Sequence, residues 1–216
     1  MSEKREETLI IVGISGVTCG GKTTTAHKLR SFLPNCKIIT QDDYYFDNDN
    51  PRHKWIQELN HVNYDILTSL DMDKMHKDVL NILNNEKLVR INHNCKKIVE
   101  DINFHDISNS LRTAKLKVLL IEGFSIFNYE PLVPLFDLKY YFTLTKEECL
   151  KRREVRVYDP PDVPGYFELC AWPEHLSQLK EVRTKVDNVD YFCGTNDLDE
   201  VAKHIMRDIF TLYNSM

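Results

Sequence analysis

The sequence predicts one α/β domain built on a doubly wound parallel sheet. Short apolar runs alternate along the chain with segments in which apolar residues recur every three or four positions. The first apolar run leads directly into a glycine-rich turn, and 216 residues suit a single domain with a full hydrophobic core. Strands that alternate with helices are joined by right-handed crossovers, which place helices on both faces of a parallel sheet. We therefore assign residues 1–216 to one domain.

The elements follow from the periodicity. The first strand is predicted at 8–14, where TLIIVGI is continuously apolar, as expected of a strand buried on both faces. A helix over 22–33 should end before Pro34. Further strands are predicted at 36–40, 117–121 and 138–144, and further helices at 71–85, 146–157, 166–184 and 198–213.

Two segments do not follow this alternation. The region 85–113 is predicted either as a hairpin, formed by KLVRI and KKIVE, or as a loop. The stretch 158–165, YDPPDVPG, cannot be helical because its three prolines remove backbone donors and restrict the residues before them. It is predicted as a rigid connection after a basic helix.

Composition narrows the classes of partner. The net charge is −5 and the basic residues form no long stripe, so we expect no nucleic-acid partner. No run approaches the roughly 18 apolar residues of a membrane span, and the charged start of the chain does not match a secretory signal. The six cysteines are scattered without a CxxC pair and are expected to be reduced. A soluble, cytoplasmic protein without a membrane partner is predicted.

The most specific motif fits the pattern GxxxxGK[ST] between a predicted strand and a predicted helix, which is the context of a phosphate-binding P-loop. Its residues, with Thr24 after them, are Gly16, Val17, Thr18, Cys19, Gly20, Gly21, Lys22 and Thr23. Glycines let the backbone N–H groups turn inward toward phosphate oxygens, and the helix N-terminus adds its positive end. Lys22 is suited to the β- and γ-phosphates of ATP, and the Thr23 hydroxyl is suited to Mg²⁺.

Carboxylates follow two of the predicted strands. Asp42 and Asp43 come after the second strand, and ligands bind at the carboxyl ends of such strands. Asp42 is our candidate for the base that takes a proton from an acceptor hydroxyl, although a solvated acidic turn would give the same pattern. Glu122 ends the third strand in LLIEG and is a candidate ligand of Mg²⁺, although an ordinary strand-end carboxylate is the alternative.

Arginines gather in a helix downstream. Arg152, Arg153 and Arg156 lie in one predicted helix and its end. Guanidinium groups neutralise the charge of a transferring phosphoryl group better than an ammonium does. We therefore predict a lid at about 146–165 that carries them over ATP. Arg153 joins Lys22, Asp42 and Glu122 as a candidate catalytic residue, whereas the alternative for this charge run is a solvated helix face.

Taken together, several motifs resemble the nicotinamide riboside kinase family, which is related to uridine kinases. They are GISGVTCGGKTT, QDDYY, Tyr64-Asp65, LLIEGF, KRREVRVYDPPDVPGYF, the following Trp172-Pro173 and the late CGT at 193–195. The resemblance spans nearly the whole chain. It implies a P-loop nucleoside kinase fold with a helical arginine-bearing lid, and ATP-dependent phosphorylation of the 5′-hydroxyl of nicotinamide riboside in NAD synthesis, with nicotinic acid riboside as a further acceptor.

The resemblance also implies residue roles. ATP would meet the P-loop residues 16–24 and a second set, which is Arg152, Arg156, Val157, Tyr158, Asn196, Asp197 and Leu198. The acceptor would meet Asp42, Asp43, Tyr44, Tyr45, Tyr64, Asp65, Arg153, Tyr158 and Asp159. Mg²⁺ would be held by Thr23 and Asp42.

These roles are chemically reasonable for that acceptor. The nicotinamide ring of the riboside is a pyridinium cation, which the faces of Tyr45 and Tyr64 can attract. Asp65 is suited to accept both ribose hydroxyls. The chain departs from the family pattern at Cys19-Gly20, which puts a thiol beside phosphate-binding amides, at Tyr45 in place of phenylalanine, and in a longer region 85–113.

Two other functions remain open at this stage. A uridine or cytidine kinase would share the phosphate site but would accept a neutral pyrimidine. A nucleotide-gated binding module would share the P-loop but would not require Asp42. We expect a small-molecule nucleoside substrate and a monomer or weak homo-oligomer.

Overall fold

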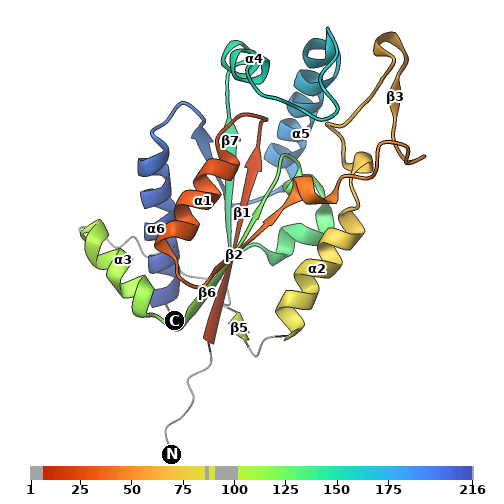
Figure 1. Cartoon of the computed structure of the whole chain (residues 1–216). Helices are drawn as coiled ribbons and strands as arrows, with labels where there is room; N and C mark the ends of the chain where they lie inside the picture. The colour runs from red at the N-terminus through yellow and green to blue at the C-terminus, as the bar shows by residue number, and fades with distance from the viewer. Residues whose placement is uncertain (1–6, 86–87, 91–101, 216) are drawn as a thin grey trace, which may run out of the picture.

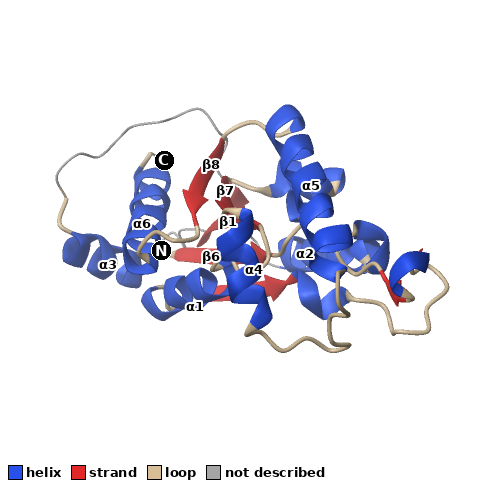
Figure 2. Cartoon of the chain, turned by 90° about the horizontal axis from the view of Figure 1, so that it is seen from above, coloured by secondary structure: helices blue, strands red, loops and turns tan. Residues whose placement is uncertain are grey.

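The core of the molecule is a parallel sheet with helices on both faces (Figure 1, Figure 2). The computed structural model describes residues 7–85, 88–90 and 102–215. The strand order is β2 (Cys36–Thr40), β6 (Leu116–Glu122), β1 (Glu7–Gly16), β7 (Leu138–Thr143) and β8 (Val189–Cys193). Every pair in this order is parallel. The predicted doubly wound α/β fold is confirmed.

The central strand β1 explains the continuous apolar run near the start of the sequence. Successive side chains of a strand point to opposite faces, and Ile10, Val12 and Ile14 enter one core cluster while Leu9 and Ile11 enter the other. All five are at most 3% exposed. Each such side chain contributes about 1.5–3 kcal/mol on burial, so β1 is held firmly from both sides at the strand that leads into the P-loop.

Helices cover the two faces of the sheet. On one face lie α1 (Lys22–Phe32), α3 (Phe104–Thr113) and α6 (Leu198–Asn214). On the other face lie α2 (Met72–Asn85) and α5 (Trp172–Lys185). The basic helix α4 (Lys146–Glu154) stands beyond the carboxyl ends of the strands, above β7 (Figure 1). This arrangement leaves the carboxyl edge of the sheet for the P-loop and the segments around it.

Some elements differ from the sequence prediction. The edge strand β8 was not predicted, because Asp190 interrupts its apolar pattern and its side chains are only partly buried. The helix predicted over 146–157 ends at Glu154, and the continuation that carries Arg156 is a loop. The helix predicted over 166–184 consists of a π-helical turn at Phe167–Ala171 followed by α5.

The region 85–113 contains part of one predicted hairpin strand and a helix that the sequence did not predict. Part of KLVRI forms β5 (Leu88–Arg90), which pairs in parallel with the first residues of β1. The partner segment KKIVE of the predicted hairpin lies outside the described residues. Helix α3 begins after Asn103, whose side chain accepts a hydrogen bond from the backbone of His105 and so caps the helix.

A short antiparallel hairpin was also not predicted. It is formed by β3 (Trp55–Ile56) and β4 (His61–Val62), between the end of β2 and α2. Figure 1 shows β3 at the outer end of the molecule, on the same side of the sheet as α5. The segment between β2 and this hairpin, and the segment after it, both contribute to the site described below.

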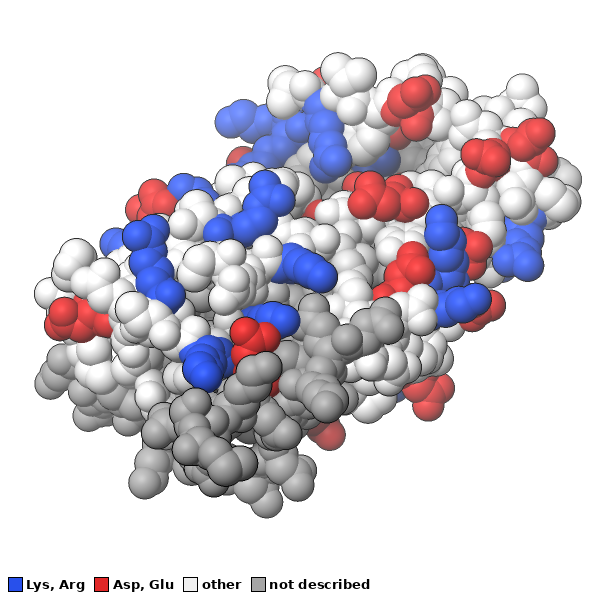
Figure 3. All heavy atoms as spheres, turned by 60° about the horizontal axis from the view of Figure 1, so that its bottom comes forward, with Lys and Arg blue, Asp and Glu red and all other residues white. Residues whose placement is uncertain are grey.

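Two surface properties complete the description. Within the described residues, no helix combines the length and apolar character needed to cross a bilayer. On the face shown in Figure 3, basic and acidic side chains are interspersed among neutral ones. The cysteines in the described part of the chain are free thiols.

Candidate active site

The P-loop connects β1 to α1. Gly16 ends β1 with a φ of 126°, and an added Cβ would come within 2.1 Å of the Phe142 carbonyl oxygen, so only glycine fits here. Gly21 precedes α1 in the left-handed conformation and provides no side-chain cap, and the first turn of α1 contains no acidic residue. The amide groups and positive end of α1 are therefore suited to bind an anion.

Lys22 lies inside this loop. Its ammonium donates to the carbonyl oxygen of Val17 at 2.8 Å, and the residue is buried. Burial lowers the pKa of Lys22 below its usual value. The carboxylate of Glu122, followed by that of Asp42, opposes this shift. The cation is thus positioned by the loop and balanced by the two carboxylates that the sequence placed at strand ends.

Thr23, Asp42 and Glu122 bring oxygen atoms together at the carboxyl edge of the sheet. The Thr23 hydroxyl donates to Glu122 Oε1 at 3.0 Å. Burial raises the pKa of Glu122, Lys22 lowers it, and Asp42 raises it further. Hard oxygen ligands of this kind, including carboxylates, are those that Mg²⁺ prefers. The residues present therefore fit the predicted Mg²⁺ site.

A buried glutamine fixes the turn that carries Asp42. Thr40, the last residue of β2, is opposite Glu122 of β6 in the sheet register. Gln41 is fully buried, donates to the hydroxyl of Ser125 at 3.1 Å and accepts from its backbone N–H at 3.1 Å. The glycine after Glu122 permits this approach, since a Cβ at Gly123 would lie 2.3 Å from Cβ of Gln41. Gln41 thereby holds Asp42 beside the end of β6.

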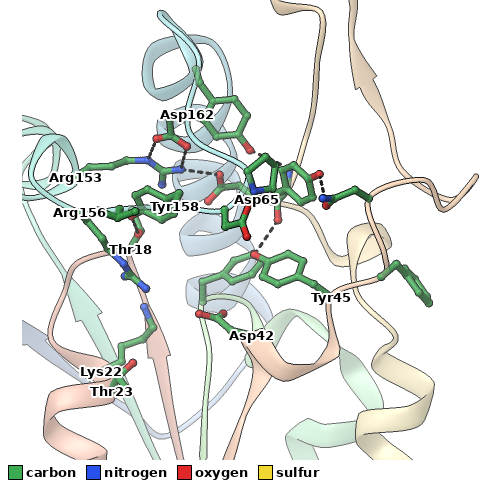
Figure 4. A pocket seen from close by; sticks show the side chains of 18 of the residues that line it. Thr18, Lys22, Thr23, Asp42, Tyr45, Asp65, Arg153, Arg156, Tyr158 and Asp162 are labelled. Atoms are coloured by element: carbon green, nitrogen blue, oxygen red, sulfur yellow. Dashed lines mark hydrogen bonds and ion pairs between the residues drawn. The ribbon is translucent and has the colours of Figure 1, made fainter.

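A cavity of about 360 Å³ extends from the P-loop toward the hairpin and the lid (Figure 4). It brings together most of the predicted site residues, namely Thr18, Lys22, Thr23, Asp42, Tyr45, Tyr64, Asp65, Glu122, Arg153, Arg156, Val157, Tyr158 and Asp159. It also includes residues that the sequence did not single out, namely Phe46, Asn48, Phe124, Pro160, Asp162 and Tyr166.

Aromatic rings form one wall of this cavity. Tyr45 stacks on Phe124 with ring centroids 6.3 Å apart, and it meets Tyr64 edge to face at 6.0 Å. The Tyr45 hydroxyl donates to the backbone carbonyl of Tyr64 at 3.1 Å, which links the end of β2 to the segment after the hairpin. Burial raises the pKa of Tyr45 well above its usual value, so the phenol stays neutral and remains a donor.

Arg153 and two carboxylates form the opposite wall (Figure 4). The Arg153 guanidinium makes two hydrogen bonds to Asp162, at 2.6 and 3.0 Å, and an ion pair with Asp65 at 3.5 Å. It also lies over the rings of Tyr158 and Tyr166, at 4.5 and 5.4 Å from their centroids. Burial raises the pKa of Asp65, while Arg153 lowers it. Arg153 thus forms ion pairs with both Asp65 and Asp162.

The loop after α4 closes the cavity above the P-loop. The Tyr158 hydroxyl contacts Thr18 Oγ1 at 3.1 Å and Cys19 Sγ at 3.5 Å. Arg156 lies over the Tyr158 ring at 5.1 Å and points toward Lys22 in Figure 4. The predicted lid residues therefore lie next to the phosphate-binding loop, and the unexpected Cys19 takes part in this contact.

Other predicted site residues do not line the cavity. Tyr44 donates to Asp78 of α2 at 3.1 Å, and Asp43 is likewise absent from the lining. Arg152 donates to the carbonyl oxygens of Cys19 and Gly194, at 3.2 and 3.0 Å, on another flank of the P-loop. On that flank Leu198 lies against Gly21, where an added Cβ would be 3.1 Å from its side chain. Of the predicted nucleotide contacts at 196–198, Leu198 thus adjoins the P-loop.

Comparison with known proteins places the chain in a family. No protein-family model matches the chain. The chain is 35% identical over 201 residues to nicotinamide riboside kinase 1 of Homo sapiens, covering 92% of this chain and 91% of that protein. It is 30% identical over 149 residues to a uridine kinase of Borreliella burgdorferi (strain ZS7), covering 66% of this chain and 65% of that protein.

Solved structures support the fold alone. The tunicamycin resistance protein of Deinococcus radiodurans superposes with a TM-score of 0.50 at 14% identity, covering 93% of this chain and 95% of that one.

The similarity in sequence extends over nearly the whole chain for the riboside kinase and over about two thirds for the uridine kinase. The chain therefore belongs to the nicotinamide riboside kinase family.

Proposed function

We propose that the protein transfers the γ-phosphate of ATP to the 5′-hydroxyl of nicotinamide riboside, with nicotinic acid riboside as a second acceptor to be compared. The observation that carries the proposal is that one cavity joins Lys22 and Thr23 of the P-loop to the aromatic and acidic walls around Tyr45 and Asp65. Membership in a family of kinases supports a phosphotransferase with an alcohol acceptor.

The P-loop end of the cavity is suited to the phosphates of ATP. The N-terminus of α1 and the ammonium of Lys22 attract the phosphate oxygens. Thr23, Asp42 and Glu122 would hold Mg²⁺ by their oxygens. Bound there, Mg²⁺ would neutralise charge on the phosphates during transfer. Arg156 is directed at the same region in Figure 4 and would stabilise the transferring group.

The other end of the cavity is suited to a cationic riboside. Tyr45 and Tyr64 provide ring faces for a pyridinium. Asp65 is held by Arg153 and would accept the ribose hydroxyls, so a deoxyribose would lose part of this contact. Asp42 lies between the two ends and would accept the proton of the 5′-hydroxyl as that oxygen attacks the γ-phosphorus. Positioning and electrostatics thus account for the chemistry.

The test of this proposal is Asp42→Asn. The amide keeps the shape of the side chain but cannot take the proton, so we expect turnover of nicotinamide riboside to fall by about 10²- to 10⁴-fold. ATP affinity, measured by calorimetry without Mg²⁺ so that the loss of a proposed metal ligand does not enter, should stay within about threefold, because Lys22 and α1 are unchanged. The matched control is Asp47→Asn, which removes a nearby carboxylate that does not line the cavity. Unchanged turnover in Asp42→Asn would remove Asp42 from the mechanism.

A substrate panel separates this function from that of a uridine or cytidine kinase. A neutral pyrimidine gains nothing from the cation-attracting rings, so nicotinamide riboside should be preferred to uridine and cytidine in kcat/KM. Strict dependence of ATP consumption on a riboside also distinguishes a kinase from a nucleotide-gated binding module. We place the reaction in the cytoplasm, by a monomer or weak homo-oligomer that needs neither nucleic acid nor membrane.

A further inference from the structure

Two side chains with complementary chemistry line the cavity near Tyr64. Asn48, from the segment between β2 and the hairpin, lines the cavity and accepts a hydrogen bond from that hydroxyl at 2.9 Å. Asp159, from the loop after α4, lines the same cavity. Burial, followed by the charge of Asp159, raises the pKa of Tyr64, which agrees with a carboxylate close to this ring.

The hydrogen bond from Tyr64 orients the Asn48 amide. Its oxygen is occupied by the Tyr64 hydroxyl, and its nitrogen therefore provides the donors toward the cavity. The carboxylate of Asp159 provides only acceptors. A donor and an acceptor at one rim match a primary carboxamide, which has one carbonyl oxygen and one NH₂ group.

The aromatic wall sets where such a group would lie. Tyr45 and Tyr64 meet edge to face, and the Tyr45 hydroxyl is bonded to the Tyr64 backbone, so the ring of Tyr64 is fixed relative to the end of β2. Asp65, beside Tyr64 in sequence, is turned toward Arg153 on the ribose side. A pyridinium ring placed against Tyr64 has its substituent edge free to face the hydroxyl end of that tyrosine, where Asn48 is bound.

We propose that Asn48 and Asp159 recognise the carboxamide of the riboside and make the enzyme select the amide riboside over the acid riboside; the inference rests on the proposed function. The Asn48 nitrogen donates to the substituent's carbonyl oxygen, which both ribosides possess. Asp159 accepts from the NH₂ group of the amide, whereas it faces a second carboxylate when the acid riboside binds. Two carboxylates facing each other in one cavity repel, so the selection is electrostatic.

The test measures kcat/KM for both ribosides with three variants. Asp159→Asn removes the negative charge and keeps the shape, so the ratio of amide to acid activity should fall by about tenfold or more, mainly through a lower KM for the acid riboside. Asn48→Asp keeps the acceptor for Tyr64 but replaces the shared donor by a second carboxylate. That ratio should rise by about tenfold, since the NH₂ group can still donate and the acid is repelled further.

The matched control is Asp49→Asn, adjacent to Asn48 and outside the cavity lining, which changes the net charge by the same amount as Asp159→Asn. It should leave the ratio within about twofold of the wild type. Stabilisation of each variant by ATP in thermal melting verifies its fold, and either variant alone suffices to test its residue.

The outcomes separate the two hypotheses. A wild-type protein that phosphorylates neither riboside would contradict the proposed function, and the pair with it. A wild-type protein that phosphorylates nicotinamide riboside, with ratios unchanged in both Asp159→Asn and Asn48→Asp, would overturn the Asn48/Asp159 pair alone. A ratio that shifts equally in Asp49→Asn would assign the effect to overall charge and also overturn the pair.

Discussion

At the scale of single residues, the position of Lys22 determines what the P-loop can do. Its ammonium is buried and bonded to Val17, and Glu122 and Asp42 oppose the loss of its charge on burial. A charge held in this way needs little rearrangement to meet phosphate oxygens, which is the property that favours a transition state in phosphoryl transfer.

Lys22→Ala should therefore weaken both nucleotide binding and turnover. The alanine loses the only side-chain cation within the P-loop sequence Gly16–Thr23 and leaves Glu122 and Asp42 less well balanced, so turnover should fall by about 10²-fold or more. Calorimetry with ATP and steady-state assays measure the two effects. Lys28→Ala serves as the control, because Lys28 lies on the same helix and forms an exposed ion pair with Asp199. A fully active Lys22→Ala would contradict the assignment of Lys22 to phosphate binding in the P-loop.

Sequence alone found residues whose role is local and missed those whose role depends on a distant partner. Lys22 and Thr23 were predicted because their motif is contiguous. Gln41 and Ser125, by contrast, are separated by 84 positions and meet only because β2 and β6 are neighbours in the sheet. Asp162 lies in a proline-rich stretch that predicted only rigidity, although it makes the shortest contact to Arg153.

At the scale of elements, β2 and β6 position the proposed base. Their register puts Thr40 opposite Glu122, and Gln41 bonds the following turn to Ser125. The consequence is that Asp42 is placed by buried backbone and amide contacts rather than by a surface loop.

Gln41→Leu should reduce turnover more than nucleotide affinity. It leaves the buried Ser125 N–H and hydroxyl without their Gln41 partner, at a cost of about 1–3 kcal/mol in the free energy of unfolding. The displaced turn should lower kcat by about tenfold with ATP affinity largely kept. Urea denaturation and steady-state kinetics measure these effects, with the exposed Gln57→Leu as control. Equal loss of ATP affinity and kcat would indicate general damage instead of misplacement of Asp42.

The elements that sequence predicted well are those with a strong pattern. The run at 8–14 alternates between two buried faces and could only be a central strand. Strand β8 and the β3–β4 hairpin were missed because they are short and partly exposed, so hydrophobic periodicity gives little signal. Strand β5 pairs in parallel with β1, a long-range contact that the local sequence KLVRI does not encode.

At the scale of the whole molecule, a buried histidine links stability to pH. His175 of α5 is 7% exposed, stacks on Tyr141 and contacts the tilted ring of Trp172. Burial lowers its pKa to about 4, with Lys22 and Arg183 acting in the same direction. The folded protein therefore keeps this imidazole neutral at a pH where the unfolded chain protonates it. The contribution of the neutral His175 to the free energy of unfolding is fully present above pH 6.5, the ordinary pKa of histidine. It is lost as the pH falls from 6.5 toward 4.

His175→Phe should therefore reduce the loss of stability on acidification. Between pH 7 and pH 5 the free energy of unfolding should fall by about 2 kcal/mol more in the wild type than in the variant, as measured by urea denaturation at these two pH values. Burial raises the pKa of Asp65 and of Glu122, which acts in the opposite sense, so the comparison must be made between variants at each pH. The exposed His27→Phe is the control, and an identical pH dependence in wild type and His175→Phe would reject this account.

The overall arrangement explains how far sequence could describe the cavity. The carboxyl edge of a parallel sheet predicts where ligands bind, so the site was expected next to the P-loop. The rest of the cavity is built from segments that are far apart in the chain. For example, the backbone N–H of Tyr64 donates a hydrogen bond to the hydroxyl of Tyr166, 102 positions away. Its lining by Asn48 and Phe124 became apparent only from the folded chain.

The small cluster around Cys149 has a mechanical consequence. Cys149 of α4 packs with Val17 of the P-loop and with Phe167 and Cys170 before α5, and its thiol bonds to the Thr18 carbonyl at 3.5 Å. Helix α4 is thereby packed against the P-loop and the segment before α5, so we expect these parts to move together. We therefore expect a hinge of the predicted lid in the segment 155–165, after α4, where Val157 is 93% exposed. The moving segment is then shorter than the predicted lid at 146–165. It carries Arg156, whereas Arg152 stays in place on α4.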